Sequence, residues 1–148
     1  MASDPKLDRQ VEAQIGVKQA ALLKANACSR VCGLLMARGR SEDWERAYEH
    51  ISEHFRFDPI KPSHGVFARR YCARDAIKTL LFRAASGPSN VTLIKLTIGG
   101  RPTGRSGVKI VRQFGEAIGD SPELRCLVII VDAGGTLITA YPATEDEL

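Results

Sequence analysis

The chain contains three histidines, His50, His54 and His64, and all of them fall within fifteen residues. Histidine is the side chain best suited to accept and donate protons near neutral pH. Arg69 and Arg70 follow shortly afterwards, and guanidinium groups can stabilise a reacting phosphate. Cleavage of RNA without a metal ion needs both functions, because a base must activate the 2′-hydroxyl, an acid must protonate the leaving oxygen and cations must surround the phosphate. The grouping therefore favours phosphodiester chemistry.

The three histidines differ in the positions that the sequence predicts for them. His64 lies between Ser63 and Gly65 in a segment flanked by prolines, which predicts an exposed loop where the glycine lets the backbone approach a ligand. An ordinary surface histidine is the alternative interpretation. His50 and His54 are four residues apart and therefore share one face of a predicted helix. We expect His54, one turn from the helix end, to reach a cleft and His50 to be half-buried.

A zinc site is a competing interpretation of the same region. Cys28 and Cys32 are one helical turn apart, as are His50 and His54, so two antiparallel helices could join the four side chains around a zinc ion. The two cysteines also follow the apolar stripe of a helix, which favours a place in the core. Four cysteines, unevenly spaced, do not indicate a disulfide framework. We therefore predict a protein that works without a metal or another cofactor.

Hydroxyl groups and cations recur on the strands predicted at the C-terminal end of the chain. Thr139 and Tyr141 alternate along the last strand and therefore share one of its faces. Two hydroxyls beside cations can hydrogen-bond a phosphate and polarise it. Threonine and tyrosine are also good strand formers that need no further role. The cations predicted on neighbouring strands are Lys95, Lys109 and Arg112.

The apolar periodicity predicts helices first and strands afterwards. Helices are expected at residues 7–37, with weak points at Gly16 and Gly33, from Ser41 until Pro59 stops the second one, and at residues 73–85. Strands are expected at residues 91–97, 107–114, 124–131 and 136–141, with a flexible basic hairpin loop over residues 99–105. This order predicts an α+β fold, in which N-terminal helices pack on an antiparallel sheet of about four strands.

The charge is concentrated in the middle of the chain. Residues 59–125 hold twelve Lys or Arg and four Asp or Glu, a net charge of +8, whereas residues 1–58 are neutral. A basic stretch between neutral flanks favours a polyanionic partner, because each neutralised phosphate releases counterions. A merely soluble basic surface is the alternative. We expect a helical N-terminal extension over residues 1–40 and a functional domain over residues 41–148.

The sequence gives no reason to expect a membrane protein. No apolar stretch approaches the length that crosses a bilayer. Residues 1–10 carry Asp4 and Asp8 and lack the apolar region of a signal peptide. We therefore expect no membrane partner, and delivery by a carrier system if the protein leaves its cell. The cysteine pattern suggests a reducing compartment at the place of action.

The part of the chain from about His54 to Pro142 resembles the toxin domains of bacterial contact-dependent inhibition and other polymorphic toxins. It is similar in particular to the barnase–EndoU–colicin–RelE ribonuclease group. The resemblance rests on a helical half that bears His54 and His64, on a helix over residues 74–85 and on the antiparallel meander. Its most specific part is the ending LVIIVDAGGTLITAYP at residues 127–142, because many such toxins finish on a strand that reads Thr-Ala-Tyr-Pro.

The resemblance implies a metal-independent endoribonuclease that leaves a 2′,3′-cyclic phosphate on RNA, with tRNA as the substrate class. It also implies a cognate acidic immunity protein and action in the cytoplasm of a target cell. No glutamate is an obvious general base, so the barnase pattern does not transfer. The catalytic set that it implies is His54, His64, Arg112, Thr139 and Tyr141. The cations expected to bind RNA are Arg69, Arg70, Lys95, Arg101, Arg105 and Lys109.

Two other classes of function stay open at this point. The first is a nucleic-acid-binding module without catalysis, which should keep its affinity for RNA when His54 and His64 are replaced by alanine. The second is a toxin domain of another chemistry, a deaminase or an ADP-ribosyltransferase. The deaminase is disfavoured because the chain lacks a His-x-Glu motif paired with Cys-x-x-Cys. The transferase is disfavoured because no nucleotide-binding signature is present.

Overall fold

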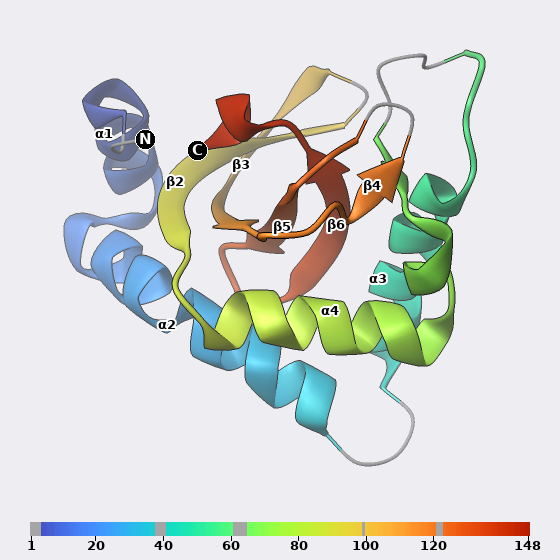
Figure 1. Cartoon of the computed structure of the whole chain (residues 1–148). Helices are drawn as coiled ribbons and strands as arrows, with labels where there is room; N and C mark the ends of the chain where they lie inside the picture. The colour runs from blue at the N-terminus through green and yellow to red at the C-terminus, as the bar shows by residue number, and fades with distance from the viewer. Residues whose placement is uncertain (1–3, 38–40, 61–64, 99, 121–122) are drawn as a thin grey trace.

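The computed structural model describes residues 4–37, 41–60, 65–98, 100–120 and 123–148. Within these residues, four α-helices precede a four-stranded antiparallel sheet, which confirms the predicted α+β fold (Figure 1). The helices are α1 (Pro5–Ile15), α2 (Val17–Met36), α3 (Glu42–Ser52) and α4 (Arg74–Ser86). The strands of the sheet, in their spatial order, are β2 (Asn90–Ile98), β3 (Arg101–Gln113), β5 (Cys126–Asp132) and β6 (Leu137–Ala143).

The first predicted helical segment forms two helices. Gly16 separates α1 from α2 and has a φ of +91°, a conformation that costs a glycine little because it has no Cβ. Asp4 caps α1 by accepting a hydrogen bond of 2.9 Å from the backbone N–H of Lys6. After this break α1 lies against β2 and β3, whereas α2 lies against α4 (Figure 1).

The helix α3 begins where the sequence predicts it and leads directly into the candidate site. Ser41 accepts a hydrogen bond of 3.3 Å from the backbone N–H of Trp44, as expected of an N-cap residue. Trp44, Ala47 and Ile51 bury one face of the helix, which packs against β6. A short 3-10 turn, η1 (Glu53–Phe55), follows and carries His54. The position of His54 is therefore fixed by a helix that is docked on the last strand.

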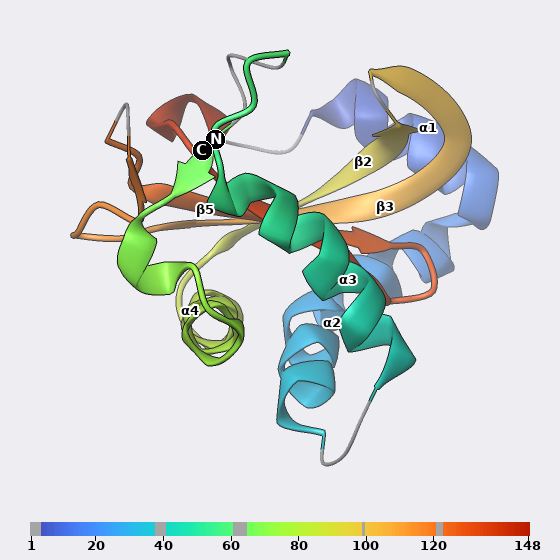
Figure 2. The ribbon, with the colours of Figure 1, turned by 90° about the vertical axis from the view of Figure 1, so that its right-hand side faces the viewer.

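The two faces of the sheet have different surroundings. Val108, Ile110, Leu127 and Ile129 point into the main core with α2 and α4, which lie on one side of the sheet in Figure 2. The opposite face holds a smaller apolar cluster built on Val111, Cys126 and Val128. A C-terminal 3-10 turn, η3 (Glu145–Glu147), lies on that second face. The second face is therefore the one on which polar side chains of the strands are accessible.

The prediction of a basic loop over residues 99–105 is wrong, because most of these residues belong to a strand. The strand β3 already starts at Arg101, where Ile98 pairs with Arg101 and Thr97 with Pro102. Gly100, with a φ of +80°, marks the turn. The hydroxyl of Thr103 also donates a hydrogen bond of 2.9 Å to the carbonyl oxygen of Leu96 across the two strands. Residues 101–105 therefore belong to a paired ribbon and not to a flexible loop.

A short second sheet lies where the sequence predicts only a loop. The strand β1 (Val66–Phe67) pairs with β4 (Gly119–Asp120), and the 3-10 turn η2 (Arg69–Tyr71) follows β1. Two-residue strands show no alternation that a sequence could reveal. This small sheet fastens the chain after His54 to the segment between β3 and β5.

The helices of the expected N-terminal extension share their core with the rest of the chain. Val11 on α1 and Leu23 and Val31 on α2 belong to the same hydrophobic cluster as Leu80 on α4 and Ile129 on β5. We therefore expect that removing these helices would expose the core. Of the helices in the described ranges, none combines the length and the apolar character needed to cross a bilayer.

Candidate functional site

A cleft of about 760 Å³ lies between α3, η1 and the strand β6. Residues from five parts of the chain line it: the α3–η1 segment, Gly65 before β1, the β2–β3 ribbon, the β5–β6 connection and β6 itself. The lining residues with chemistry to offer a phosphate are Arg46, His50, His54, Arg105, Thr139 and Tyr141. The cleft therefore joins a histidine of the helical half to the hydroxyls of the last strand, as the sequence predicts.

Contacts with Gly65 and Tyr141 orient the His54 ring. Its Nδ1 lies 2.8 Å from the carbonyl oxygen of Gly65. Its ring stacks on the ring of Tyr141, with centroids 5.5 Å apart and an angle of 25° between the planes. A carbonyl oxygen can only accept, so Nδ1 carries the hydrogen of this bond and Nε2 of the neutral ring keeps its lone pair. His54 is therefore arranged to accept a proton at Nε2.

Gly65 is the residue that brings this carbonyl to His54. A Cβ added at Gly65 would overlap the carbonyl oxygen of Pro142, the last residue of the Thr-Ala-Tyr-Pro segment. The overlap involves backbone atoms, which cannot turn aside as a flexible side chain can. The close approach of residue 65 to β6 therefore requires a glycine. The histidine, the glycine and the end of β6 form one continuous contact.

Replacing Gly65 with alanine is expected to destabilise the protein by about 1–3 kcal/mol, because the added methyl group must push β6 and residue 65 apart. Chemical denaturation measures the loss as a lower midpoint. Gly33→Ala is a matched control, since Gly33 lies exposed in α2 with no atom within 4 Å of the added Cβ. This control should be neutral or slightly stabilising. Equal stability of the two variants would contradict the required contact.

Thr139 and Tyr141 share one face of β6, as their alternation predicts. Thr139 pairs with Ile130 and Tyr141 pairs with Val128, and both side chains line the cleft. Burial raises the pKa of the Tyr141 hydroxyl, and the nearby carboxylate of Glu147 raises it further. The hydroxyl therefore stays protonated at neutral pH and can donate a hydrogen bond.

Two arginines bring positive charge to the cleft. Arg105 reaches it from β3, and Arg46 reaches it from α3. Neither lies within ion-pair distance of a carboxylate in the part of the chain that the structure describes. Arg46 escaped the sequence prediction because it lies in the neutral half of the chain. Arg46 lies four residues before His50 and eight before His54. This spacing puts the three residues on one side of a helical segment, and it could have predicted that Arg46 lies beside the histidines.

A second hollow of about 450 Å³ adjoins the cleft across the open face of the sheet. Arg105, Thr139 and Tyr141 line both hollows. Lys95 and Lys109, expected to bind RNA, line the second one. The Lys95 ammonium donates a hydrogen bond of 2.6 Å to Gln14 of α1, whereas Lys109 forms an ion pair with Glu147. The two hollows together form a groove that runs from η1 across β6 and β5 to β3.

Arg112 does not join this groove, which corrects the predicted catalytic set. Tyr141 pairs with Val128, which pairs with Val111 on β3. Arg112 is the next residue after Val111 and pairs with Leu127, so its side chain lies on the opposite face of the sheet from Tyr141. Its guanidinium therefore points to the helical side of the sheet, donates a hydrogen bond of 3.2 Å to the carbonyl oxygen of Arg83 and lies over the ring of Phe114. A shift of one residue along a strand moves a side chain to the opposite face.

The other residues predicted for the site differ in where they lie. Arg70 lies 3.9 Å from Glu116 and over the ring of Tyr71, so its charge is engaged outside the cleft. Arg69 in η2 and Arg101 on β3 are exposed and line neither hollow. His64 lies outside the described residues. His50 is exposed on α3 at the rim of the cleft, and not half-buried as expected.

The four residues of the competing zinc site do not gather around one point. Cys28 and Cys32 pack against the main core, with Cys28 Sγ 3.5 Å from the hydroxyl of Ser89. Burial raises the pKa of the Cys32 thiol, and Cys28 adds to the rise. Across the described ranges, no three or more His, Cys, Asp or Glu side chains are placed to hold a metal ion together. The cysteines therefore contribute to packing.

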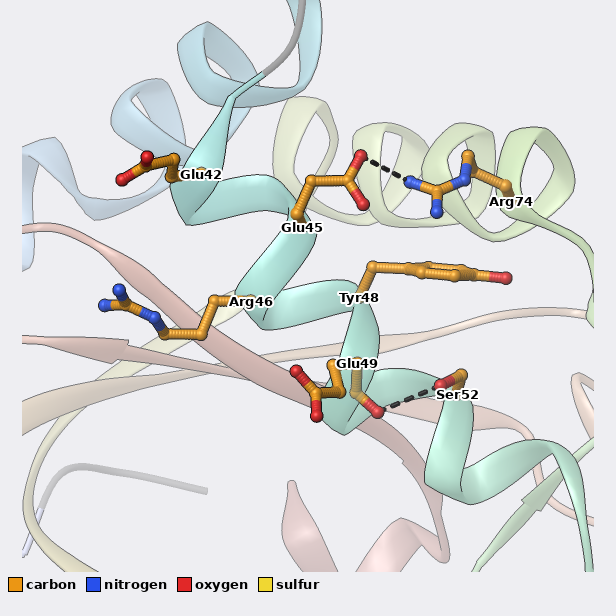
Figure 3. A pocket seen from close by; sticks show the side chains of 7 residues that line it. All are labelled: Glu42, Glu45, Arg46, Tyr48, Glu49, Ser52 and Arg74. Carbon is orange, nitrogen blue, oxygen red and sulfur yellow. Dashed lines mark hydrogen bonds and ion pairs between the residues drawn. The ribbon is translucent and has the colours of Figure 1, made fainter.

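A larger hollow of about 970 Å³ lies on the outer side of α3 (Figure 3). Three glutamates, Glu42, Glu45 and Glu49, line it. Two arginines, Arg46 and Arg74, also line it. Arg74 is already engaged, because it pairs with Glu45 at 2.8 Å and its guanidinium lies 4.2 Å from the centroid of the Tyr48 ring. An acidic, ion-paired surface repels phosphate. This hollow is therefore a poor site for RNA in spite of its size.

The chain was compared with models of known protein families, with curated proteins and with solved structures, and none of the three comparisons found a match. The cleft combines an oriented histidine, the hydroxyl groups of Thr139 and Tyr141 and two arginines. The carboxylates of Glu53 and Asp132 also line it.

Proposed function

We propose that the protein is a metal-independent endoribonuclease of the bacterial toxin type, with its active site in the cleft between η1 and β6. One observation carries the proposal: His54 stacks on Tyr141 while the carbonyl of Gly65 holds its Nδ1. A histidine so held presents Nε2 as a base beside the hydroxyl of a protonated tyrosine. This pairing suits a reaction that removes one proton and stabilises a phosphate at the same place.

The reaction is a transesterification within the RNA chain. Nε2 of His54 takes the proton of a 2′-hydroxyl, and the 2′-oxygen attacks the neighbouring phosphorus. The bond from phosphorus to the 5′-oxygen breaks, so that one fragment ends in a 2′,3′-cyclic phosphate. The departing 5′-oxygen must gain a proton. His64 is the candidate donor that the toxin resemblance implies.

The charge on the phosphate rises as the 2′-oxygen attacks. Arg46 and Arg105 are placed to neutralise it, because both reach the cleft and have no carboxylate partner in the described ranges. Thr139 and Tyr141 offer hydroxyl donors from β6. Donors that are already oriented stabilise developing charge most effectively, because they need not reorganise during the reaction.

The biological setting follows from the same proposal and from the toxin resemblance. The substrate is RNA, with tRNA as the class that the resemblance implies, and the place of action is the cytoplasm of a target cell reached through a carrier system. A producing cell must neutralise such an enzyme. An acidic immunity protein that covers the groove would do so, because arginines and lysines line it.

Incubation of the purified protein with total tRNA in EDTA tests the proposal. We expect discrete fragments, each with a 2′,3′-cyclic phosphate that resists phosphatase until acid opens the ring. A DNA oligonucleotide should stay intact, because it lacks the 2′-hydroxyl that attacks. Cleavage only after addition of Mg²⁺, or cleavage of DNA, would contradict the mechanism. RNA that is bound but left whole would favour the non-enzymatic binding module.

A further inference from the structure

The open face of the sheet carries an acidic segment beside the cleft. The Nζ atom of Lys109 lies 2.9 Å from Oε2 of Glu147 in the turn η3. Two residues earlier, Glu145 accepts a hydrogen bond of 2.9 Å from the side chain of Gln113. Leu148 packs against the apolar cluster of Val111, Cys126 and Val128 on the same face. The segment is therefore fixed across β3 and β5 by one apolar and two polar contacts.

Glu147 lies inside the groove and not beside it. The hollow of about 450 Å³ is lined by both members of the pair, Lys109 and Glu147, and also by Thr139 and Tyr141. Lys109, Ile130 and Thr139 face one another across β3, β5 and β6. The effect of the Glu147 carboxylate on the pKa of Tyr141 likewise indicates that it is close to the proposed active site.

A carboxylate and a phosphate bind a lysine ammonium through the same contact, a charge-assisted hydrogen bond to an anionic oxygen. Lys109 is only 25% exposed in its side chain, and its ammonium is already paired with Glu147. An RNA chain that leaves the cleft along the groove would bring a phosphate to this lysine. The phosphate and the Glu147 carboxylate would then compete for one cation.

We propose that Lys109 is a phosphate-binding subsite for the RNA chain, and that Glu147 occupies this subsite in the free protein as an internal competitor. The inference rests on the proposed function, because it assigns the groove to the same RNA. A partly exposed ion pair contributes little to folding stability, so an incoming phosphate can replace it. RNA binding then requires η3 to release Lys109.

The test measures affinity for a short single-stranded RNA that carries 2′-O-methyl groups and cannot be cleaved, by fluorescence anisotropy at low salt. We expect Glu147→Gln to bind this RNA about 3- to 10-fold more tightly than the unmodified protein. Glu145→Gln is the matched control, since it removes the same charge from the same turn but faces Gln113. Its affinity should change less than about 2-fold.

The Lys109→Ala variant shows whether the gain acts through the subsite. It should weaken RNA binding, and Glu147→Gln should give no further gain in the Lys109→Ala background. Glu147→Asp keeps the net charge but shortens the side chain by one methylene group, which weakens the contact with Lys109, so an intermediate gain is expected even if Glu147→Gln folds poorly. Thermal unfolding of each variant checks that the fold is kept.

Several outcomes would overturn the inference. They are an unchanged affinity in Glu147→Gln, an equal gain in Glu145→Gln, a gain that persists without Lys109, or no RNA binding by any variant. The proposed function can fail separately. If the affinities follow the expected pattern but the unmodified protein never cuts RNA, only the catalytic assignment is lost; if it cuts RNA and the Glu147 variants behave like the unmodified protein, only the competitor is lost.

Discussion

Replacing His54 with asparagine is expected to lower the rate of RNA cleavage by about 10²- to 10⁴-fold, the usual contribution of a positioned proton-transfer group. Asparagine carries an amide N–H near the place of Nδ1 and can still donate to the carbonyl of Gly65. It has no counterpart of Nε2. The substitution therefore separates the base from its anchoring contact. Initial rates on a defined RNA, at substrate concentrations above and below KM, measure the loss.

The substitution should lower kcat and change KM by no more than a few-fold, because His54 transfers a proton and does not bind the charge of the RNA. The anchoring contact can be checked by the melting temperature, which should stay close to that of the unmodified protein. His50→Asn makes the same chemical change on the exposed rim of the cleft and should cost far less activity. A His54→Asn protein that retains near-full activity would remove this residue from the mechanism.

The sequence was sufficient for the fold class, for the four strands of the main sheet and for one half of the site. The switch from helical periodicity to alternation predicted both the fold class and the approximate strands, because it reflects which faces are buried. The meeting of His54 with Thr139 and Tyr141 was also predicted. It followed from the toxin resemblance together with the alternation of the two hydroxyl residues. Both signals are local, which is why they survive in a single sequence.

The failures came from register and from close backbone contacts. Arg112 was assigned to the right strand but to the wrong face, because only pairing with Leu127 on β5 fixes which way it points. Gly65 was expected to let the backbone approach a ligand, whereas it lets the backbone approach Pro142. Arg46 was missed because charge was counted along the chain and not across the fold. Such information is non-local and absent from periodicity.

The net charge of the middle segment overstated the positive charge that RNA would meet. Two of its cations, Arg74 and Lys109, pair with carboxylates that lie outside the segment, Glu45 and Glu147. Such surface pairs contribute little to stability, but each removes a cation from the available charge. The cleft obtains its positive charge from Arg46, in the neutral half of the chain, and from Arg105. The ion pairs that engage the basic segment are Arg70–Glu116, Arg74–Glu45, Arg83–Glu116, Lys109–Glu147 and Arg125–Glu123.

Removing only the hydroxyl of Tyr141 is expected to lower kcat by about 10²- to 10³-fold, the range found when one donor to a developing oxyanion is deleted. Tyr141→Phe keeps the aromatic ring that stacks on His54, so the orientation of the base is retained. Because burial and Glu147 raise the pKa of this hydroxyl, it stays a donor up to high pH. The rate of the unmodified protein divided by that of Tyr141→Phe should therefore stay constant between about pH 6 and 9.

Tyr48→Phe is the matched control for this prediction. Tyr48 lies on the outer side of α3, where it lines the acidic hollow and not the cleft, so loss of its hydroxyl should leave kcat unchanged (Figure 3). A further variant, Tyr141→Ala, should lose more activity than Tyr141→Phe, because it also removes the ring that fixes His54. If Tyr141→Phe keeps full activity while Tyr141→Ala loses it, the tyrosine positions His54 and does not stabilise the phosphate. If the rate of the unmodified protein divided by that of Tyr141→Phe rises between pH 6 and 9, the hydroxyl acts in its ionised form and not as a donor.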